Sequence, residues 1–216
     1  MMKQDLVRFA GSVFAPLFGP LDRVTLHRVG EREMRLARAI RNRNAYAGEA
    51  AVREIERRRA EMLASQELLI DGSIADDYEA DSGKTLGTVT LASKPQSRAL
   101  LLYSLAREFL PATILELGTN VGVSSAYLAA AVPSASVMTL EGSKYRAQRA
   151  RELHGELGLT NIEYRTGNFA DTLAPALAAM APVEMAFIDG HHQYQPTLDY
   201  FEAILAQAAE ACVYVF

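Results

Sequence analysis

Short apolar runs alternate with longer amphipathic segments from residue 96 to the end of the chain. The short runs are typical of buried strands, and Pro111, Pro133 and Gly158 mark the ends of the segments between them. This pattern predicts strands at 113–117, 136–140, 162–166, 183–188 and 212–216, and helices at 97–109, before Pro133, and at 144–157, 171–180 and 197–209. Strands and helices that alternate in this way form right-handed βαβ units. We therefore expect an α/β fold with a Rossmann-like, doubly wound, mainly parallel sheet that helices cover on both faces.

The first 95 residues lack this alternation. Residues 23–69 carry an interrupted apolar stripe at helical spacing, which predicts one or two helices with a break near Asn42, Asn44 and Gly48. Residues 71–95 are rich in Gly, Asp and Ser, show no sustained period, and are expected to form a linker or a lid loop. The expected organisation is a helical N-terminal extension at 1–70, the linker or lid loop at 71–95, and an α/β domain at 96–216.

The uneven distribution of charge narrows the class of partner. Residues 1–70 hold 13 Lys and Arg against 9 Asp and Glu, whereas residues 71–216 hold 9 against 17, in a chain of net charge −4. The arginines at 53–59 alternate with glutamates at helical spacing, which favours ion pairs along a helix over a nucleic-acid surface. We therefore expect no nucleic-acid partner. The alternative, a helical nucleic-acid binder that uses residues 32–59, predicts binding to RNA or DNA with a steep salt dependence.

Three features of the sequence bear on the expected location of the protein. No run of 18 apolar residues is present, so we expect no membrane span. Cys212 is the only cysteine and has no partner for an internal disulfide, which predicts a reducing, cytoplasmic compartment. The N-terminal segment contains an apolar patch, but Asp5 and Arg8 interrupt it, so we interpret it as a packing or interfacial segment and not as a signal peptide.

Doubly wound sheets bind ligands beyond the carboxyl ends of their strands, so the loops after the strands are the candidate site. After the first strand, Glu116 precedes a loop in which Gly118 and Gly122 have the spacing G-x-x-x-G. These glycines either allow a ligand or a helix to approach closely or only turn the chain. Glu116 would repel a phosphate but would accept hydrogen bonds from an ammonium group, which favours a cofactor with a cationic amino-acid end.

The next two loops carry side chains suited to a nucleoside. Glu141 and Gly142 follow the second strand, 19 residues beyond the second glycine, close to the interval at which an acidic residue reaches ribose hydroxyls. Taken alone, Glu141 is equally suited to cap a helix that begins near Ser143. After the third strand, Asn168 and Phe169 offer an amide and a ring for the edge and face of adenine, although a simple turn explains them equally well.

The fourth strand is followed by Asp189-Gly190-His191-His192-Gln193-Tyr194. Adjacent histidines point in different directions, which disfavours a metal site formed by the two together. Asp189 and His192 can share a site, with one as a general base and the other as a metal ligand or orienting group. A loop held by hydrogen bonds without a catalytic role is the alternative.

Together, these four loops resemble the class I S-adenosylmethionine-dependent methyltransferases. The resemblance is greatest to a small-molecule O-methyltransferase-like branch with Asp-Gly-x-His-x-Tyr after the fourth strand, and ILELGTNVGVSSAYLA at 114–129 looks like the glycine loop of that branch. The resemblance covers about residues 97–216 and implies S-adenosylmethionine as the cofactor. The residues implied at the cofactor are Glu116, Gly118, Thr119 and Gly122 along the methionine moiety, Ser124 and Ser125 at the adjoining helix, Glu141 at the ribose, Asn168 and Phe169 beside the adenine, and Asn120, Gly142 and Asp189 in the same loops.

The resemblance also implies a reaction. A methyl group is expected to pass to a hydroxyl of a small-molecule acceptor, and the proton is removed by His192, by a divalent cation at Asp189, or by both. In metal-dependent members the carboxylate after the fourth strand binds Mg²⁺ together with an Asp-Asp or Asp-Asn pair after the fifth strand, and this chain stops at Phe216. The 71–95 loop is a candidate lid, in which Lys84 and Lys94 either meet an anionic acceptor or stay solvated at the surface.

The family's sheet normally continues through two further strands, so we expect the domain to be C-terminally incomplete, either truncated or completed by a partner. A homodimer through the open sheet edge or the N-terminal helices is one such arrangement. Two other functions remain alternatives: a non-catalytic cofactor-binding or assembly module on the same fold, and a nicotinamide-dependent oxidoreductase. The oxidoreductase would carry the spacing G-x-G-x-x-G, which this chain lacks.

Overall fold

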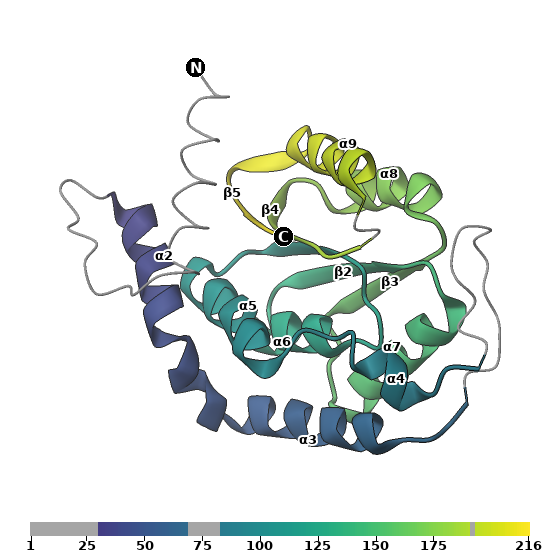
Figure 1. The fold of residues 1–216 in the computed structure, drawn as a ribbon. Helices are drawn as coiled ribbons and strands as arrows, with labels where there is room; N and C mark the ends of the chain where they lie inside the picture. Colours follow the sequence, from purple (N-terminus) through teal and green to yellow (C-terminus); the bar gives the residue numbers. More distant parts are fainter. Residues whose placement is uncertain (1–29, 69–82, 191–192) are drawn as a thin grey trace. The chain divides into compact units, whose positions relative to one another are not determined.

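The structure is a computed structural model that describes residues 30–68, 83–190 and 193–216 (Figure 1). The chain divides into two compact units, Met1–Met34 and Arg35–Phe216. Helix α2 (Glu31–Asn42) begins in the first unit. The second unit contains the sheet, the helices that cover it and the loops of the candidate site.

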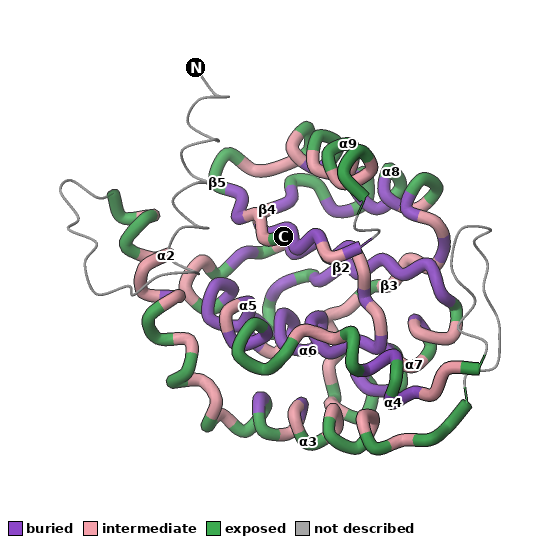
Figure 2. Tube along the Cα trace, viewed as in Figure 1, coloured by how far each residue is buried: buried purple, intermediate pink, exposed green. Residues whose placement is uncertain are grey.

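The sheet has five parallel strands in the order β3-β2-β1-β4-β5. The strands are β1 (Thr113–Leu117), β2 (Ser136–Glu141), β3 (Ile162–Thr166), β4 (Val183–Ile188) and β5 (Ala208–Val215). In the register of the three central strands, Leu115 of β1 lies between Met138 of β2 and Ala186 of β4. These strands are buried almost throughout (Figure 2), which explains their nearly continuous apolar sequences. The predicted parallel, Rossmann-like sheet is confirmed.

Helices cover both faces of this sheet. They are α5 (Gln96–Phe109), α6 (Val123–Ala131), α7 (Lys144–Glu156), α8 (Phe169–Met180) and α9 (Tyr194–Leu205). Alternate residues of one strand enter different cores: Ile114 packs with α5 and α6, whereas Leu115 packs with α8 and with Ile204 of α9. Figure 1 shows α8 and α9 on one face and α5, α6 and α7 on the other. The fold is therefore doubly wound, as the alternation of strands and helices predicted.

The last two elements differ in extent from their prediction. Helix α9 begins at Tyr194 and ends at Leu205, and β5 begins at Ala208, four residues before the predicted start. The reason is pairing with β4: the Val183 amide donates to the carbonyl of Gln207, and Val183 is in register with Ala208. Contact with a neighbouring strand thus recruits small residues whose own preference for strand is weak.

The break predicted in the N-terminal helices is confirmed. Helix α2 ends at Asn42, a 3₁₀ helix, η3, spans Arg43–Gly48, and α3 spans Ala50–Ala64. The apolar side of α3 is part of the core, because Val52 and Ile55 are buried in the same cluster as α5 and α6. Tyr127 of α6 donates to Glu56 of α3 at 2.8 Å, so a buried ring and its hydroxyl also hold α3 against the domain.

The segment expected to be a linker or lid is in part a helix. Residues 69–82 lie outside the described residues, but residues 86–90 form helix α4 (Leu86–Thr90), whose start is capped by Thr85. A Cβ added at Gly87 would lie 2.6 Å from the carbonyl oxygen of Leu63, so α4 packs closely on the end of α3. Five residues are too few to show a helical period, which is why the pattern of residues predicted a loop.

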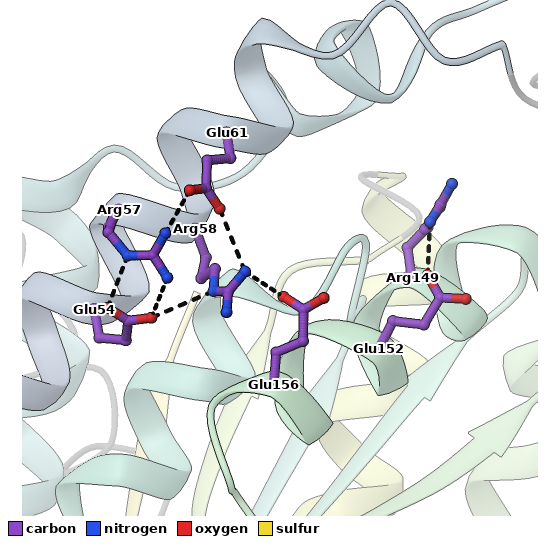
Figure 3. A network of polar contacts seen from close by, with 7 residues as sticks. All are labelled: Glu54, Arg57, Arg58, Glu61, Arg149, Glu152 and Glu156. Carbon is purple, nitrogen blue, oxygen red and sulfur yellow. Dashed lines mark hydrogen bonds and ion pairs between the residues drawn. The ribbon is translucent and has the colours of Figure 1, made fainter.

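The charged face of α3 forms the expected ion pairs along its helix (Figure 3). Arg57 pairs with both Glu54 and Glu61, and Arg58 reaches α7, where its guanidinium lies 2.9 Å from Glu156. A groove of about 240 Å³ lies between the two helices, and its charged side chains are already paired with one another. Exposed pairs of this kind contribute little to stability. In the part of the chain that the structure describes, no helix is long and apolar enough to cross a membrane.

Candidate active site

The loops after β1 and β4 meet at the carboxyl end of the sheet. The Asp189 amide donates to the carbonyl of Leu117 at 2.8 Å, and the Gly118 amide donates to the carbonyl of Leu140 at 2.9 Å. Gly118 has a φ of +97°, and a Cβ on this residue would lie 2.6 Å from the carbonyl oxygen of Asp189. Only glycine fits here, because both the backbone conformation and the contact between the two loops exclude a side chain.

Glu116 is fully buried at the end of β1, where its carboxylate lies among hydroxyl side chains. Its Oε2 accepts a hydrogen bond from Thr139 Oγ1 at 2.6 Å, and the hydroxyl of Thr119 lies 2.5 Å from that of Thr139. Its Oε1 has no hydrogen-bond partner among the described residues. Burial raises the pKa of Glu116 to about 7, against the opposing effect of hydroxyls that include Ser124 and Thr139. A buried carboxylate with a free oxygen fits the ammonium group of an amino acid.

Glu141 accepts hydrogen bonds from both the glycine loop, residues 118–122, and the start of α7. It is 2% exposed, its Oε2 accepts from the Asn120 amide at 2.7 Å, and its Oε1 accepts from the Ser143 amide at 2.9 Å. Ser143 is the N-cap of α7, since its own hydroxyl accepts from the Arg146 amide, so Glu141 is not the cap. Gly142 is buried between them. The expected contact of Glu141 with ribose hydroxyls stays a prediction.

Gly122 serves the packing of helices. It has a φ of +89°, and a Cβ on this residue would lie 2.9 Å from Ala150 Cα and 2.7 Å from His154 Nε2, both on α7. The sequence left open whether this glycine faces a ligand or a packed helix, and the structure places it against the helix. Ser125 is fully buried and donates to the carbonyl of Gly122 at 3.2 Å, and Ser124 is also buried.

His154 is a site-supporting residue that the sequence analysis missed. Its ring lies 2.8 Å from the Gly122 carbonyl through Nε2 and 2.6 Å from the Tyr164 hydroxyl through Nδ1. These partners assign the proton to Nε2, because the carbonyl of Gly122 can only accept. Burial lowers the pKa of His154 to about 4. It shares the buried side of α7 with Ala147, Ala150 and Leu153, and this helical spacing was the signal that could have identified it.

His154 and Glu116 are expected to oppose each other in the dependence of stability on pH. His154 has a folded pKa of about 4 against 6.5 unfolded, so its contribution is complete above 6.5 and declines as the pH falls towards 4. Glu116 has a folded pKa of about 7 against 4.5, so its contribution is complete below 4.5 and declines as the pH rises through 7. Each contribution amounts to roughly 3 kcal/mol, because each pKa differs by about 2.5 between the folded and unfolded states.

Urea unfolding between pH 4.5 and pH 7 tests this opposition. The wild type should depend weakly on pH, Glu116→Gln should gain stability as the pH rises, and His154→Gln should lose it. Both variants keep the size of a polar side chain, so they remove mainly the titration. A Glu116→Gln variant with the pH dependence of the wild type would contradict the assignment.

Asn168 and Phe169 lie where β3 leads into α8. Asn168 is the N-cap of this helix, and its side-chain oxygen accepts from the Ala170 amide at 3.2 Å. Phe169 is 5% exposed and packs edge-on against Tyr200, with ring centroids 5.5 Å apart. A Cβ added at Gly190 would lie 2.7 Å from Cζ of Phe169, so the ring also supports the loop after β4. Their expected contact with adenine stays a prediction.

Asp189 forms an ion pair with Lys94. Their charged atoms are 2.6 Å apart, and the two side chains are only 16% and 22% exposed. Helix α4, which lies just before Lys94 in the sequence, also contacts the glycine loop, because Asn120 Nδ2 donates to the carbonyl of Val89 at 3.0 Å. His192, the candidate base, lies outside the described residues together with His191.

Among the residues that the structure describes, no three His, Cys, Asp or Glu side chains are grouped to hold a metal ion. The carboxylate of Asp189 faces the ammonium of Lys94, whereas a divalent cation would require further oxygen ligands. Mg²⁺ at Asp189 stays a prediction.

Residues 115–216 match a family model described as a methyltransferase domain. This segment is a methyltransferase domain. The match begins in β1 and continues to the last residue, so it includes all four loops on which the sequence-based prediction depended. The prediction of the methyltransferase family is thereby confirmed over these residues.

Solved structures of methyltransferases share the fold. One is the O-methyltransferase TomG from Streptomyces achromogenes, which is involved in tomaymycin synthesis and was solved in complex with SAM. TomG is 22% identical to this chain, with a TM-score of 0.55, and the match covers 86% of this chain and 73% of TomG. The SAH-bound methyltransferase PaMTH1 from Podospora anserina is 16% identical, with a TM-score of 0.57 over 89% and 72%. A methyltransferase from Geobacter sulfurreducens is 22% identical, with a TM-score of 0.50 over 57% and 61%. At these identities the similarity establishes the methyltransferase fold and leaves the acceptor undetermined.

Proposed function

We propose that the chain is an S-adenosylmethionine-dependent methyltransferase that transfers a methyl group to a hydroxyl of a small-molecule acceptor. The observation that carries this proposal is the buried Oε1 of Glu116, which has no hydrogen-bond partner among the described residues and lies at the carboxyl end of β1 in a methyltransferase domain. An ammonium group would satisfy it, and the amino-acid end of S-adenosylmethionine carries one. TomG and PaMTH1, which share the fold, were solved with SAM and SAH.

The remaining cofactor contacts follow from the order of the loops. We assign the ribose hydroxyls to the carboxylate of Glu141, which ends β2 and precedes Gly142. The buried Oδ1 of Asn120 also lacks a partner among the described residues and is a second acceptor close to Glu141. Adenine is assigned to the loop of Asn168 and Phe169, at the end of the neighbouring strand β3.

The reaction needs little covalent chemistry from the protein. S-adenosylmethionine supplies a methyl group on a sulfonium; the acceptor oxygen bonds to that carbon, the C–S bond breaks with its electron pair left on sulfur, and the hydroxyl proton goes to a base. We assign the base to His192, whose ordinary pKa near 6.5 suits proton transfer at neutral pH. The protein mainly places the two reactants in line and holds the charges around them.

Calorimetric titration with S-adenosylhomocysteine tests the cofactor assignment. Micromolar affinity is expected near pH 8. Because the carboxylate of Glu116 must be ionised to bind an ammonium group, and its pKa is about 7, affinity should fall about tenfold from pH 8 to pH 6. Glu116→Gln should bind weakly, and this part of the pH dependence should disappear.

A folded wild type that releases no heat with S-adenosylhomocysteine at any of these pH values would refute the proposed cofactor. The fold is checked in the same samples by circular dichroism. An exposed acid on α7, Glu152, provides the charge-matched control: Glu152→Gln should retain the affinity and the pH dependence of the wild type.

A further inference from the structure

A row of four side chains crosses the sheet at the level of Glu116. The strand register places Glu116 of β1 beside Thr139 of β2 and Phe187 of β4, and it places Thr139 beside Tyr164 of β3. Residues that are in register on neighbouring strands project from the same face of the sheet. Thr139 is therefore the residue of β2 that meets the carboxylate of Glu116, although it lies within a strand and outside the four loops of the candidate site.

The hydroxyl of Thr139 is buried in an apolar strand. Thr139 is 1% exposed, and its neighbours on β2, Met138 and Leu140, are buried apolar residues. Valine has nearly the same shape and suits a strand equally well, and it would avoid the free-energy cost of burying a hydroxyl. This cost is offset here by hydrogen bonds with Glu116 and Thr119. These two bonds are therefore the feature that distinguishes Thr139 from an ordinary core residue.

The hydrogen bonds of Thr139 have one possible direction when Glu116 is ionised. A carboxylate only accepts, so the single hydroxyl proton of Thr139 is donated to Oε2 of Glu116 at 2.6 Å. The hydroxyl of Thr119, 2.5 Å away, must then donate to Thr139. This chain directs its protons at one oxygen of the carboxylate. The other oxygen, Oε1, is left without a hydrogen-bond partner among the described residues.

The hydrogen bond from Thr139 also limits the rotation of the carboxylate. The last torsion of a glutamate side chain has only a broad preference, so the strand backbone does not fix where the two oxygens lie. A bond of 2.6 Å from the neighbouring strand holds Oε2 and thereby sets the position of Oε1. Burial raises the pKa of Glu116, and the hydroxyls of Ser124, Thr139 and Ser125 oppose this effect. Thr139 thus favours both the ionised form and one orientation of the carboxylate.

We propose that Thr139 is a positioning residue for the cofactor, whose hydroxyl holds the carboxylate of Glu116 in the rotation that presents Oε1 to the ammonium group. This inference rests on the proposed function and adds to it a residue of β2. Because Thr139 acts through Glu116, its loss should weaken recognition of the ammonium group and leave recognition of the nucleoside intact.

Calorimetry with two ligands isolates this effect. The first ligand is S-adenosylhomocysteine, and the second is its deaminated analogue, in which hydrogen replaces the amino group. The wild type at pH 7 should bind S-adenosylhomocysteine about tenfold more tightly than the analogue, or better, because the hydrogen bond joins two charged groups. Thr139→Val should lower this ratio of affinities about fivefold, since the carboxylate loses a charge-assisted hydrogen bond. Thr139→Ser keeps the hydroxyl and should retain the ratio of the wild type.

Thr113→Val is the matched control for Thr139→Val. It makes the same substitution at the opposite end of β1, where the hydroxyl donates to the carbonyl of Pro182, and it should leave the ratio unchanged. General damage to the fold would weaken both ligands together. A Thr139→Val variant with the ratio of the wild type, or a Thr139→Ser variant that loses it, would therefore overturn the role of Thr139 alone. A folded wild type that binds neither ligand would refute the proposed function and this inference with it.

Discussion

Replacing Glu141 with alanine is expected to weaken S-adenosylhomocysteine binding at least a hundredfold. The carboxylate accepts from the amides of Asn120 and Ser143, so its loss removes two charge-assisted hydrogen bonds that shape the glycine loop, besides the proposed bonds to the ribose. Hydrogen bonds to a charged group contribute about 1.5–3 kcal/mol each, and a factor of one hundred needs about 2.8 kcal/mol. Calorimetry against the wild type measures the loss.

Two variants make this result specific to Glu141. Glu141→Gln keeps the shape and one acceptor oxygen, so an affinity between those of the wild type and Glu141→Ala is expected. Glu152→Ala removes an exposed acid from α7 and should leave the affinity unchanged. If Glu141→Ala binds within threefold of the wild type while remaining folded, then the ribose assignment is wrong and Glu141 has a purely structural role.

Gly122→Ala is expected to lower the free energy of unfolding by about 3 kcal/mol. The residue has a φ of +89°, a conformation that costs a non-glycine residue about 1–2 kcal/mol. In addition, the new Cβ would lie 2.9 Å from Ala150 Cα and 2.7 Å from His154 Nε2, and overpacking of this kind costs about 1–3 kcal/mol. Urea unfolding monitored by circular dichroism measures the difference.

Helix α7 provides the matched control for this substitution. Gly155 lies on the same helix, has an ordinary backbone conformation, and a Cβ there would meet no atom within 4 Å. Gly155→Ala should therefore stabilise the protein by about 0.5–1 kcal/mol through helix propensity. Equal effects of the two substitutions would show that the contact between the glycine loop and α7 is less tight than the structure indicates.

Hydrophobic periodicity predicted the α/β domain well because it is a property of the chain itself. The first four predicted strands match β1–β4 to within one residue, since each is an apolar run bounded by turn residues. Prediction from the sequence failed for elements that are very short or that depend on pairing with another strand. Helix α4 is too short to show a period, and the start of β5 depends on its pairing with Val183 and not on the residues from Ala208 onward.

For the candidate site, too, some features could be predicted from the sequence and others could not. The sequence could locate Glu116, Glu141 and Asp189, because the carboxyl ends of parallel strands form one edge of the sheet whatever the side chains are. The partners of these residues could not be found, since they come from distant parts of the chain. His154 under Gly122 and Lys94 beside Asp189 are contacts of this kind.

The sequence by itself therefore determined the order of strands and helices, the methyltransferase motifs and the loops that carry the candidate residues. Only the tertiary structure decided that Oε1 of the buried Glu116 has no hydrogen-bond partner among the described residues, that Gly122 faces a helix, and that Asp189 forms an ion pair with Lys94. The physical reason is that local patterns fix which face of each element is buried, whereas ionisation and hydrogen bonding depend on which distant groups the packing brings within a few ångströms.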